Sequence, residues 1–162
     1  MQSILIVKLL ILLTLANGAP VVAKKILGAR FARPLDGGLM LADGRPLFGA
    51  SKTIRGVVLA ILAATAGAPL LGFSWRVGFV AGIAAMIGDL LSSFLKRRLN
   101  LTPSSRATGI DQIPESLFPF LACAGMLSLT AVDIAVGVAI FFIGELLVSR
   151  VLYKFRLRDR PY

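Results

Sequence analysis

Asp89 is the acidic residue of this sequence whose surroundings best suit chemistry. On a helix of 3.6 residues per turn it shares one stripe with Ser93 and Lys96, and Ser92 and Arg97 flank that stripe. A carboxylate about 10 Å deeper in a membrane than Lys96 costs on the order of 2–3 kcal/mol or more unless a cation or water meets it. The stripe is therefore either an internal Asp–Lys pair that locks helices together, or a metal or phosphate site opening at the cytosolic surface.

Three more acidic residues lie in or beside apolar stretches. Asp111 precedes Pro114, which suits the first turn of a helix, so Asp111 either caps that helix or serves as a ligand near its N-terminus. Glu115 is a first-turn acid or a ligand. Glu145 lies inside the last apolar stretch, where it bonds across helices, pairs with a lysine or joins the active site.

A third polar element joins a Gly-rich loop to an apolar stretch and carries Ser51, Lys52, Thr53 and Arg55. Hydroxyl and cationic donors at a helix N-terminus suit phosphates. The spacing does not fit a Walker A motif.

The composition excludes several kinds of chemistry. The chain has no histidine and one cysteine, Cys123, which lies in an apolar stretch and is read as a buried or lipid-facing residue. Ser-His and Cys-His nucleophilic pairs, thiolate metal sites and disulfides are therefore absent. Carboxylates and cations without histidine suit Mg²⁺ shared with substrate phosphates, which indicates metal-dependent phosphate chemistry on a lipid.

The elements that must position these residues are membrane helices. Of the 162 residues, 57% are hydrophobic, and the mean hydropathy is +0.85. We expect an all-α polytopic membrane protein, one domain over residues 1–162, with a break in the first helix at the segment 17–20. The predicted spans cover residues 4–23, 54–73, 77–95, 114–130 and 134–152.

The net charge of +10 is concentrated in the loops 24–53 and 96–113 and in the tail 153–162. This alternation predicts an N-terminus outside and a C-terminus in the cytoplasm of an inner membrane, with the site facing the cytoplasm. Basic residues that flank apolar stretches argue against nucleic acid. Asp36 and Asp43 lie in Asp-Gly turn signals, where they are either solvated turn residues or functional ones, and their role stays open. Asp133 is expected as a helix N-cap and Asp159 in solvent.

The sequence resembles the membrane CTP-dependent cytidylyltransferases, and the CDP-archaeol synthases more closely than the bacterial CDP-diacylglycerol synthases. The resemblance rests on GDLLSSFLKRR at 88–98 and GIDQ at 109–112. It extends to ANGAPV at 16–21, PLDGG at 34–38, DGRPLFG at 43–49 and SKTIRG at 51–56. The bacterial Gly-His-Gly-Gly segment is missing before Asp111, and Gln112 replaces its arginine, so the lipid chains, isoprenoid ether or acyl ester, stay open.

The resemblance implies that CTP and a phosphorylated lipid give a CDP-lipid and pyrophosphate with Mg²⁺. It implies metal ligation by Asp89 and Asp111, with Lys96 beside them in catalysis, and CTP contacts from Ser51, Lys52, Thr53, Arg55, Ser93 and Arg97. The expected partners are CTP, a lipid phosphate, the bilayer and, as an open alternative, a second copy in a homodimer. A non-catalytic subunit that binds anionic lipid and a small membrane carrier are the rival readings.

Overall fold

A computed structural model describes residues 2–101 and 109–154, with side chains as far as Leu147. The described residues form five helices, and each corresponds to one predicted span, which confirms the all-α fold. Asp159 and most of the predicted tail 153–162 lie outside the described residues. The helices are α1 (Ser3–Leu27), α2 (Ile54–Leu70), α3 (Trp75–Arg98), α4 (Gln112–Leu127) and α5 (Ala131–Lys154).

The first helix is longer than its hydropathy predicts. The expected break is wrong: α1 continues without interruption to Leu27 and contains Pro20. Membrane helices tolerate such a proline because neighbouring groups can satisfy the backbone group it frees. At 25 residues α1 is about 37 Å long, so it exceeds a hydrocarbon core of about 30 Å.

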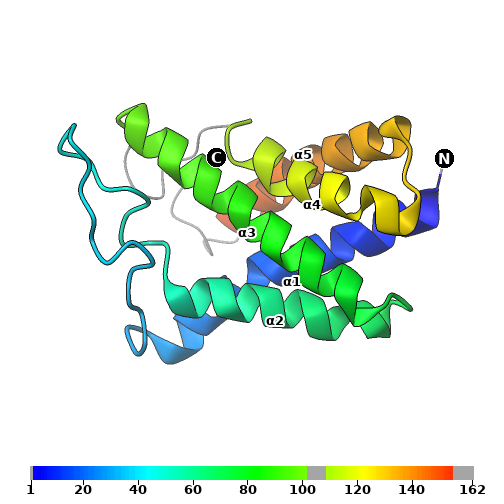
Figure 1. Cartoon of the computed structure of the whole chain (residues 1–162), viewed down its shortest axis with the longest axis horizontal. Coiled ribbons are helices and arrows are strands. Elements are labelled where there is room, and N and C mark those ends of the chain that lie inside the picture. Colours follow the sequence, from blue (N-terminus) through cyan, green and yellow to red (C-terminus); the bar gives the residue numbers. More distant parts are fainter. Residues whose placement is uncertain (1, 102–108, 155–162) are drawn as a thin grey trace.

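By length and apolar composition, α1 and α3 could each cross a membrane, and α2 is apolar but shorter at 17 residues. Consecutive helices run in opposite directions (Figure 1), and the segment 28–53 between α1 and α2 projects at the end opposite the N-terminus.

Helix α3 is the centre of the bundle, because it packs most extensively on α2 and α4 and also contacts α1. Small residues make this possible: a Cβ at Gly78 would collide with the backbone of Ala64, and a Cβ at Gly82 would lie 3.0 Å from the Cα of Ile61. Such residues let membrane helices approach closely. The core continues through buried apolar residues including Leu9, Leu12, Leu13, Phe120 and Cys123.

Hydrogen bonds at the end of the bundle that holds the N-terminus correct one prediction. Asp133 is the third residue of α5 rather than its N-cap, and it exchanges hydrogen bonds with Thr130. This reciprocal arrangement satisfies N–H groups that the helix start leaves open. Asp133 also accepts a hydrogen bond of 2.8 Å from the backbone N–H of Gln2, which ties the start of α1 to α5.

The loop between α1 and α2 is folded by local turns. As predicted, Asp36 and Asp43 lie in turns, where their carboxylates accept hydrogen bonds from the backbone N–H groups of Gly38 and Arg45. Isolated bridges pair Pro34 with Thr53 and Met40 with Pro46. The loop therefore returns on itself and brings the residues just before α2 back toward the end of α1.

Candidate active site

Helix α3 presents its polar stripe toward the loops and the start of α4. Ser92, Ser93, Lys96 and Arg97 are all buried, and Asp89 lies one turn deeper. Toward the interior of the bundle, the neighbouring residues of α3 are mostly apolar. Lys96 and Arg97 lie at the other end of the helix, in its last turn. Cations there also favour the negative end of the helix dipole. The helix thus carries a carboxylate, hydroxyls and cations on one face.

Asp89 forms an ion pair with Lys52, which approaches from the loop just before α2. The Lys52 Nζ lies 2.5 and 2.6 Å from the two carboxylate oxygens of Asp89. The sequence pattern placed Lys96 as the nearest lysine on the Asp89 stripe, but the actual partner comes from another element. Both side chains remain about a quarter exposed, at 22% and 27%, so a ligand can reach the pair.

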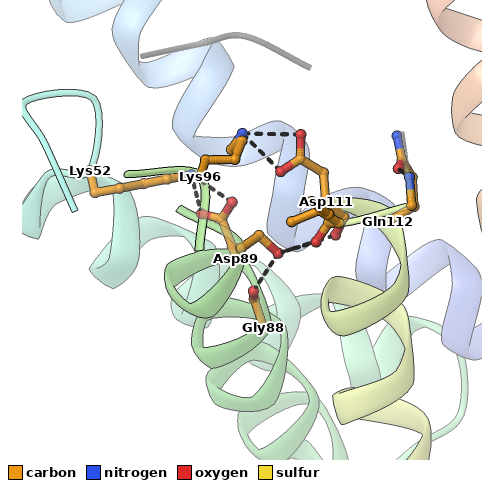
Figure 2. Close-up of polar contacts among 9 residues, drawn as sticks. Lys52, Gly88, Asp89, Lys96, Asp111 and Gln112 are labelled. Atoms are coloured by element: carbon orange, nitrogen blue, oxygen red, sulfur yellow. Dashed lines mark hydrogen bonds and ion pairs between the residues drawn. The ribbon is translucent and has the colours of Figure 1, made fainter. Parts of the chain in front are cut away.

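A second ion pair lies beside the first. The Lys96 Nζ donates to Asp111, at 2.8 and 3.0 Å from its two carboxylate oxygens. Figure 2 shows the two pairs adjacent to each other, above the start of α4. We call the four side chains of Lys52, Asp89, Lys96 and Asp111 the twin-pair centre.

Ser92 and Gly88 hold α3 against the start of α4. The Ser92 hydroxyl lies 2.7 Å from the carbonyl oxygen of Ile110, directly before Asp111, and 2.8 Å from that of Gly88. A Cβ at Gly88 would lie 2.8 Å from the Cα of Glu115. Only glycine permits this approach, so the depth of Asp111 relative to Asp89 is fixed by backbone contact.

Asp111 occupies the position before α4, as the sequence predicts. Within the described part of the chain, however, its carboxylate caps no N–H of that helix and binds Lys96 instead. Two roles were predicted for Asp111, a cap of α4 or a ligand near its N-terminus. The structure favours the second, because Asp111 belongs to the twin-pair centre. Gln112 is buried beside it and accepts a hydrogen bond from the N–H of Gly109.

The remaining predicted phosphate-binding residues fall into two groups. Thr53 is the N-cap of α2 and Arg55 donates to the carbonyl groups of Gly28 and Arg30 after α1, so both have structural partners. Ser51 is exposed next to Lys52, whereas Ser93 is buried in α3. Arg97, which is also buried, interacts electrostatically with Asp111.

Two cavities of about 360 Å³ each lie near the centre. The first, here called the loop-side cavity, reaches Asp89 and is bordered by cations. Its lining comes from the end of α1, residues 28–32, residues 50–57 and α3, and includes Lys24, Lys52, Arg55 and Asp89.

The second cavity, here called the membrane groove, lies among α1, α4 and α5. It is mostly apolar, and its lining residues are Leu10, Thr14, Asn17, Gly18, Glu115, Ile140, Phe141, Gly144 and Glu145. Glu115 packs against Gly88, the residue before Asp89, so the groove ends close to the twin-pair centre.

Sequence patterns did not identify every residue around the site. Glu115 and Glu145 were left with several readings, although acidic residues in apolar stretches are a signal of function. Asn17, whose side-chain oxygen is buried without a hydrogen-bond partner among the described residues, was read only as part of a helix break. Its position on a groove became apparent only when α1, α4 and α5 were placed together.

The donor set fits a hard divalent cation that is shared with a substrate. Among residues 2–101 and 109–154, no group of three or more His, Cys, Asp or Glu side chains could hold a metal alone. Mg²⁺ is commonly bound by one or two carboxylates together with substrate phosphates. Asp89 and Asp111 supply two such carboxylates. Each is paired with a lysine, so a bound ion would take the place of Lys52 or Lys96 beside its carboxylate.

Comparisons with known proteins agree on one family. The family profile described as "CarS-like: CDP-archaeol synthase" matches residues 69–162. A CDP-archaeol synthase from Sulfurisphaera tokodaii is 34% identical, over 80% of this chain and 81% of the relative. One from Pyrobaculum calidifontis is 32% identical, over 91% of this chain and 90% of the relative.

A solved structure of an intramembrane enzyme for archaeal membrane lipid biosynthesis has the same fold. It superposes with a TM-score of 0.76 and 28% sequence identity, and the match covers 88% of this chain and 90% of that one. The predicted resemblance is confirmed, and the chain belongs to the CDP-archaeol synthase family.

Proposed function

We propose that the chain transfers the cytidylyl group of CTP to a phosphorylated archaeol at the twin-pair centre, giving CDP-archaeol and pyrophosphate. Membership of the family makes it a CTP-using cytidylyltransferase of the membrane, as the sequence led us to expect. The observation that carries the location is the position of two adjacent Asp–Lys pairs between two cavities of different character.

The loop-side cavity is suited to CTP. It borders Lys24, Lys52 and Arg55, and cationic groups neutralise a triphosphate. Ser51 adds an exposed hydroxyl beside Lys52. We therefore place the triphosphate next to Lys52 and the nucleoside further toward residues 28–32.

The membrane groove is suited to the lipid. Its walls are apolar helix faces of α1, α4 and α5, and it ends at Glu115 next to the twin-pair centre. A lipid whose chains lie in this groove would hold its phosphate toward Asp89 and Asp111. The two substrates would then meet from opposite sides without either crossing the other's cavity.

In the reaction, an oxygen of the lipid phosphate attacks the α-phosphorus of CTP, and the bond to the β-phosphate breaks to release pyrophosphate. A lipid phosphate is already anionic near pH 7, so no protein base is required. Lys52 and Lys96 would exchange their carboxylate partners for phosphate oxygens, which neutralises charge where it develops. Because both ammonium groups are held by carboxylates beforehand, they are positioned before the substrates arrive.

Asp89 and Asp111 would hold Mg²⁺ together with phosphate oxygens. When bound, the ion supplies charge neutralisation at the α-phosphate and the leaving pyrophosphate. Arg97, which is buried and interacts electrostatically with Asp111, would add a positive charge beside the two carboxylates and the phosphates.

The proposed orientation places the N-terminus outside and the twin-pair centre on the cytoplasmic side. The cationic residues gather in the segment 24–55 and at the end of α3, and cytoplasmic loops carry the positive excess. A C-terminal reporter should therefore lie in the cytoplasm and an N-terminal reporter outside. The homodimer stays a prediction.

The test is mass spectrometry of the products that the detergent-purified chain forms from CTP and a panel of lipid phosphates. We expect CDP-archaeol from archaeol phosphate and a smaller yield from diacyl phosphatidic acid. Asp89→Asn should abolish the product in a protein with an unchanged melting temperature. Failure of the wild-type chain to form any CDP-lipid would refute the proposal.

A further inference from the structure

We infer that Asp36 is a positioning residue for Lys52, because its carboxylate fixes the turn from which Lys52 reaches the twin-pair centre. Asp36 lies in the loop between α1 and α2, outside the cavities and away from the reacting atoms proposed above. The inference deepens the proposed function, since it assigns a role to a residue that would touch neither substrate.

The carboxylate of Asp36 binds two separate parts of the loop. One oxygen, Oδ2, accepts hydrogen bonds of 2.9 Å each from the backbone N–H groups of Phe48 and Gly49. The other, Oδ1, accepts a bond of 3.0 Å from the N–H of Gly38. One side chain therefore joins the beginning of the loop to the turn just before Lys52.

The backbone completes the connection on both sides of Lys52. The N–H of Lys52 donates to the carbonyl of Gly49 at 3.1 Å, and its carbonyl accepts from the N–H of Leu35 at 2.8 Å. Leu35 is adjacent to Asp36, and Gly49 is bound by it. Both peptide groups of Lys52 are thus held by residues that Asp36 fixes, and the Lys52 side chain extends from this frame to Asp89.

A carboxylate suits position 36 because its two oxygens accept hydrogen bonds from three N–H groups that converge there. Burial of the Asp36 carboxyl opposes ionisation, but the hydrogen bonds from Gly49, Phe48 and Gly38 together hold its pKa below the usual value. These backbone donors stabilise the ionised carboxylate in the turn. Gly49 takes a left-handed conformation with φ of +91°, which the turn needs and other residues adopt poorly.

A second set of contacts attaches the loop to α3 without Asp36. Arg98 donates to the carbonyl groups of Arg45 and Pro46 and pairs with Asp43 at 2.5 Å, while Arg45 donates to the carbonyl of Arg98. Loss of the Asp36 carboxylate should therefore loosen the turn at residues 47–52 and leave the rest of the loop attached.

The experiment compares Asp36→Ala and Asp36→Asn with Asp43→Ala as a matched control. Asp43 is an aspartate of the same loop that caps a turn, and Arg98 keeps its two carbonyl partners without it. Steady-state kinetics would give KM for CTP and for lipid phosphate separately. Hydrogen exchange of residues 48–52 and acylation of Lys52 by an amine-reactive reagent would report the geometry without requiring turnover.

For Asp36→Ala we expect the KM for CTP to rise about tenfold or more, because three hydrogen bonds that order the turn are lost. The KM for the lipid and the melting temperature should change little, whereas exchange at 48–52 and acylation of Lys52 should increase. Asp36→Asn should restore part of the loss, since its one oxygen can still accept from Phe48 and Gly49. Asp43→Ala should behave as the wild type.

Unchanged exchange at 48–52 and an unchanged KM for CTP in Asp36→Ala would overturn the inference. So would a parallel rise of both KM values with a lower melting temperature, because that pattern indicates general destabilisation. If the wild-type chain forms no CDP-lipid, the proposed function fails, and the exchange and acylation measurements still decide the role of Asp36.

Discussion

Replacement of Gly88 by alanine tests whether the packing of α3 on α4 sets the geometry of the twin-pair centre. The added Cβ would lie 2.6 Å from the carbonyl carbon of Pro114 and 2.8 Å from the Cα of Glu115. Carbon atoms in contact normally lie about 3.5–4.0 Å apart, so the start of α4 must withdraw by roughly 1 Å. These neighbours are backbone atoms, which cannot rotate away as a flexible side chain can.

The withdrawal would carry Asp111 away from Asp89 and stretch the 2.7 Å hydrogen bond between Ser92 and Ile110. A displacement of about 1 Å in a catalytic arrangement can lower a rate about 100-fold. Overpacking of this kind also costs typically about 1–3 kcal/mol of stability. We therefore expect kcat/KM for CDP-lipid formation to fall about 100-fold in Gly88→Ala, with a folded protein still present.

The assay is kcat/KM on purified protein, with folding checked by size-exclusion chromatography and thermal melting. The control is Gly125→Ala on α4, because a Cβ at Gly125 would meet nothing within 4 Å. The control should stay within about twofold of the wild type, as expected for a substitution in open space. Wild-type kcat/KM in Gly88→Ala would refute the reasoning that α3–α4 contact fixes the two aspartates.

Three further predictions concern charge in and around the site. Asp89→Asn and Asp111→Asn should each lower CDP-lipid formation by orders of magnitude, and the double variant should be scarcely worse than either single one, because the two carboxylates act as a unit; near wild-type turnover in a well-folded Asp89→Asn protein would contradict this. Thorough chelation of divalent ions should abolish turnover and added Mg²⁺ should restore it, whereas full activity after chelation would remove the metal assignment. Hydrogen bonds lower the pKa of Asp36 in the folded state. Its carboxylate should therefore stabilise the fold above its unfolded pKa of about 3.9, and this stabilisation should be lost as the pH falls through the lower pKa of the folded state. The difference between the melting temperatures of the wild type and Asp36→Ala, which we expect to be small, should accordingly stay constant from about pH 8 to 5 and shrink below about pH 4. A difference that disappears near neutral pH would contradict this explanation.

The helices could be predicted from the sequence because membrane spans have a strong hydropathy signal. All five were located, but their ends were not. Hydropathy ends the first span near Ala23, whereas α1 continues through Lys24 and Lys25 to Leu27. Charged side chains at a membrane surface do not disrupt a helix. They only lower the mean hydropathy, so the predicted span ends before the helix does. Pro20 misled the prediction for a related reason, since its local preference is overridden by the packing of α1 in the bundle.

The sequence indicated which residues form the site but not which of them pair with each other. Spacing on one helix relates Asp89 to Lys96, because residues seven positions apart share a stripe. It cannot relate Asp89 to Lys52, which is 37 positions away and reaches it from a loop. The same limit applies to Asp36, whose Asp-Gly pair marks a turn but does not indicate that its second oxygen binds Phe48 and Gly49.

The pairing of Lys52 with Asp89 has a consequence for how the chain enters a membrane during synthesis. Lys52 lies two residues before α2, and Asp89 lies in α3. A short turn at residues 71–74 connects these two helices into a hairpin. An unpaired aspartate near the middle of an inserting helix costs about 2.5–3.5 kcal/mol. Since the hairpin brings its own lysine, Asp89 can be paired before α4 is made. Asp111 follows in the same way, because Lys96 is already in place on α3 when α4 arrives.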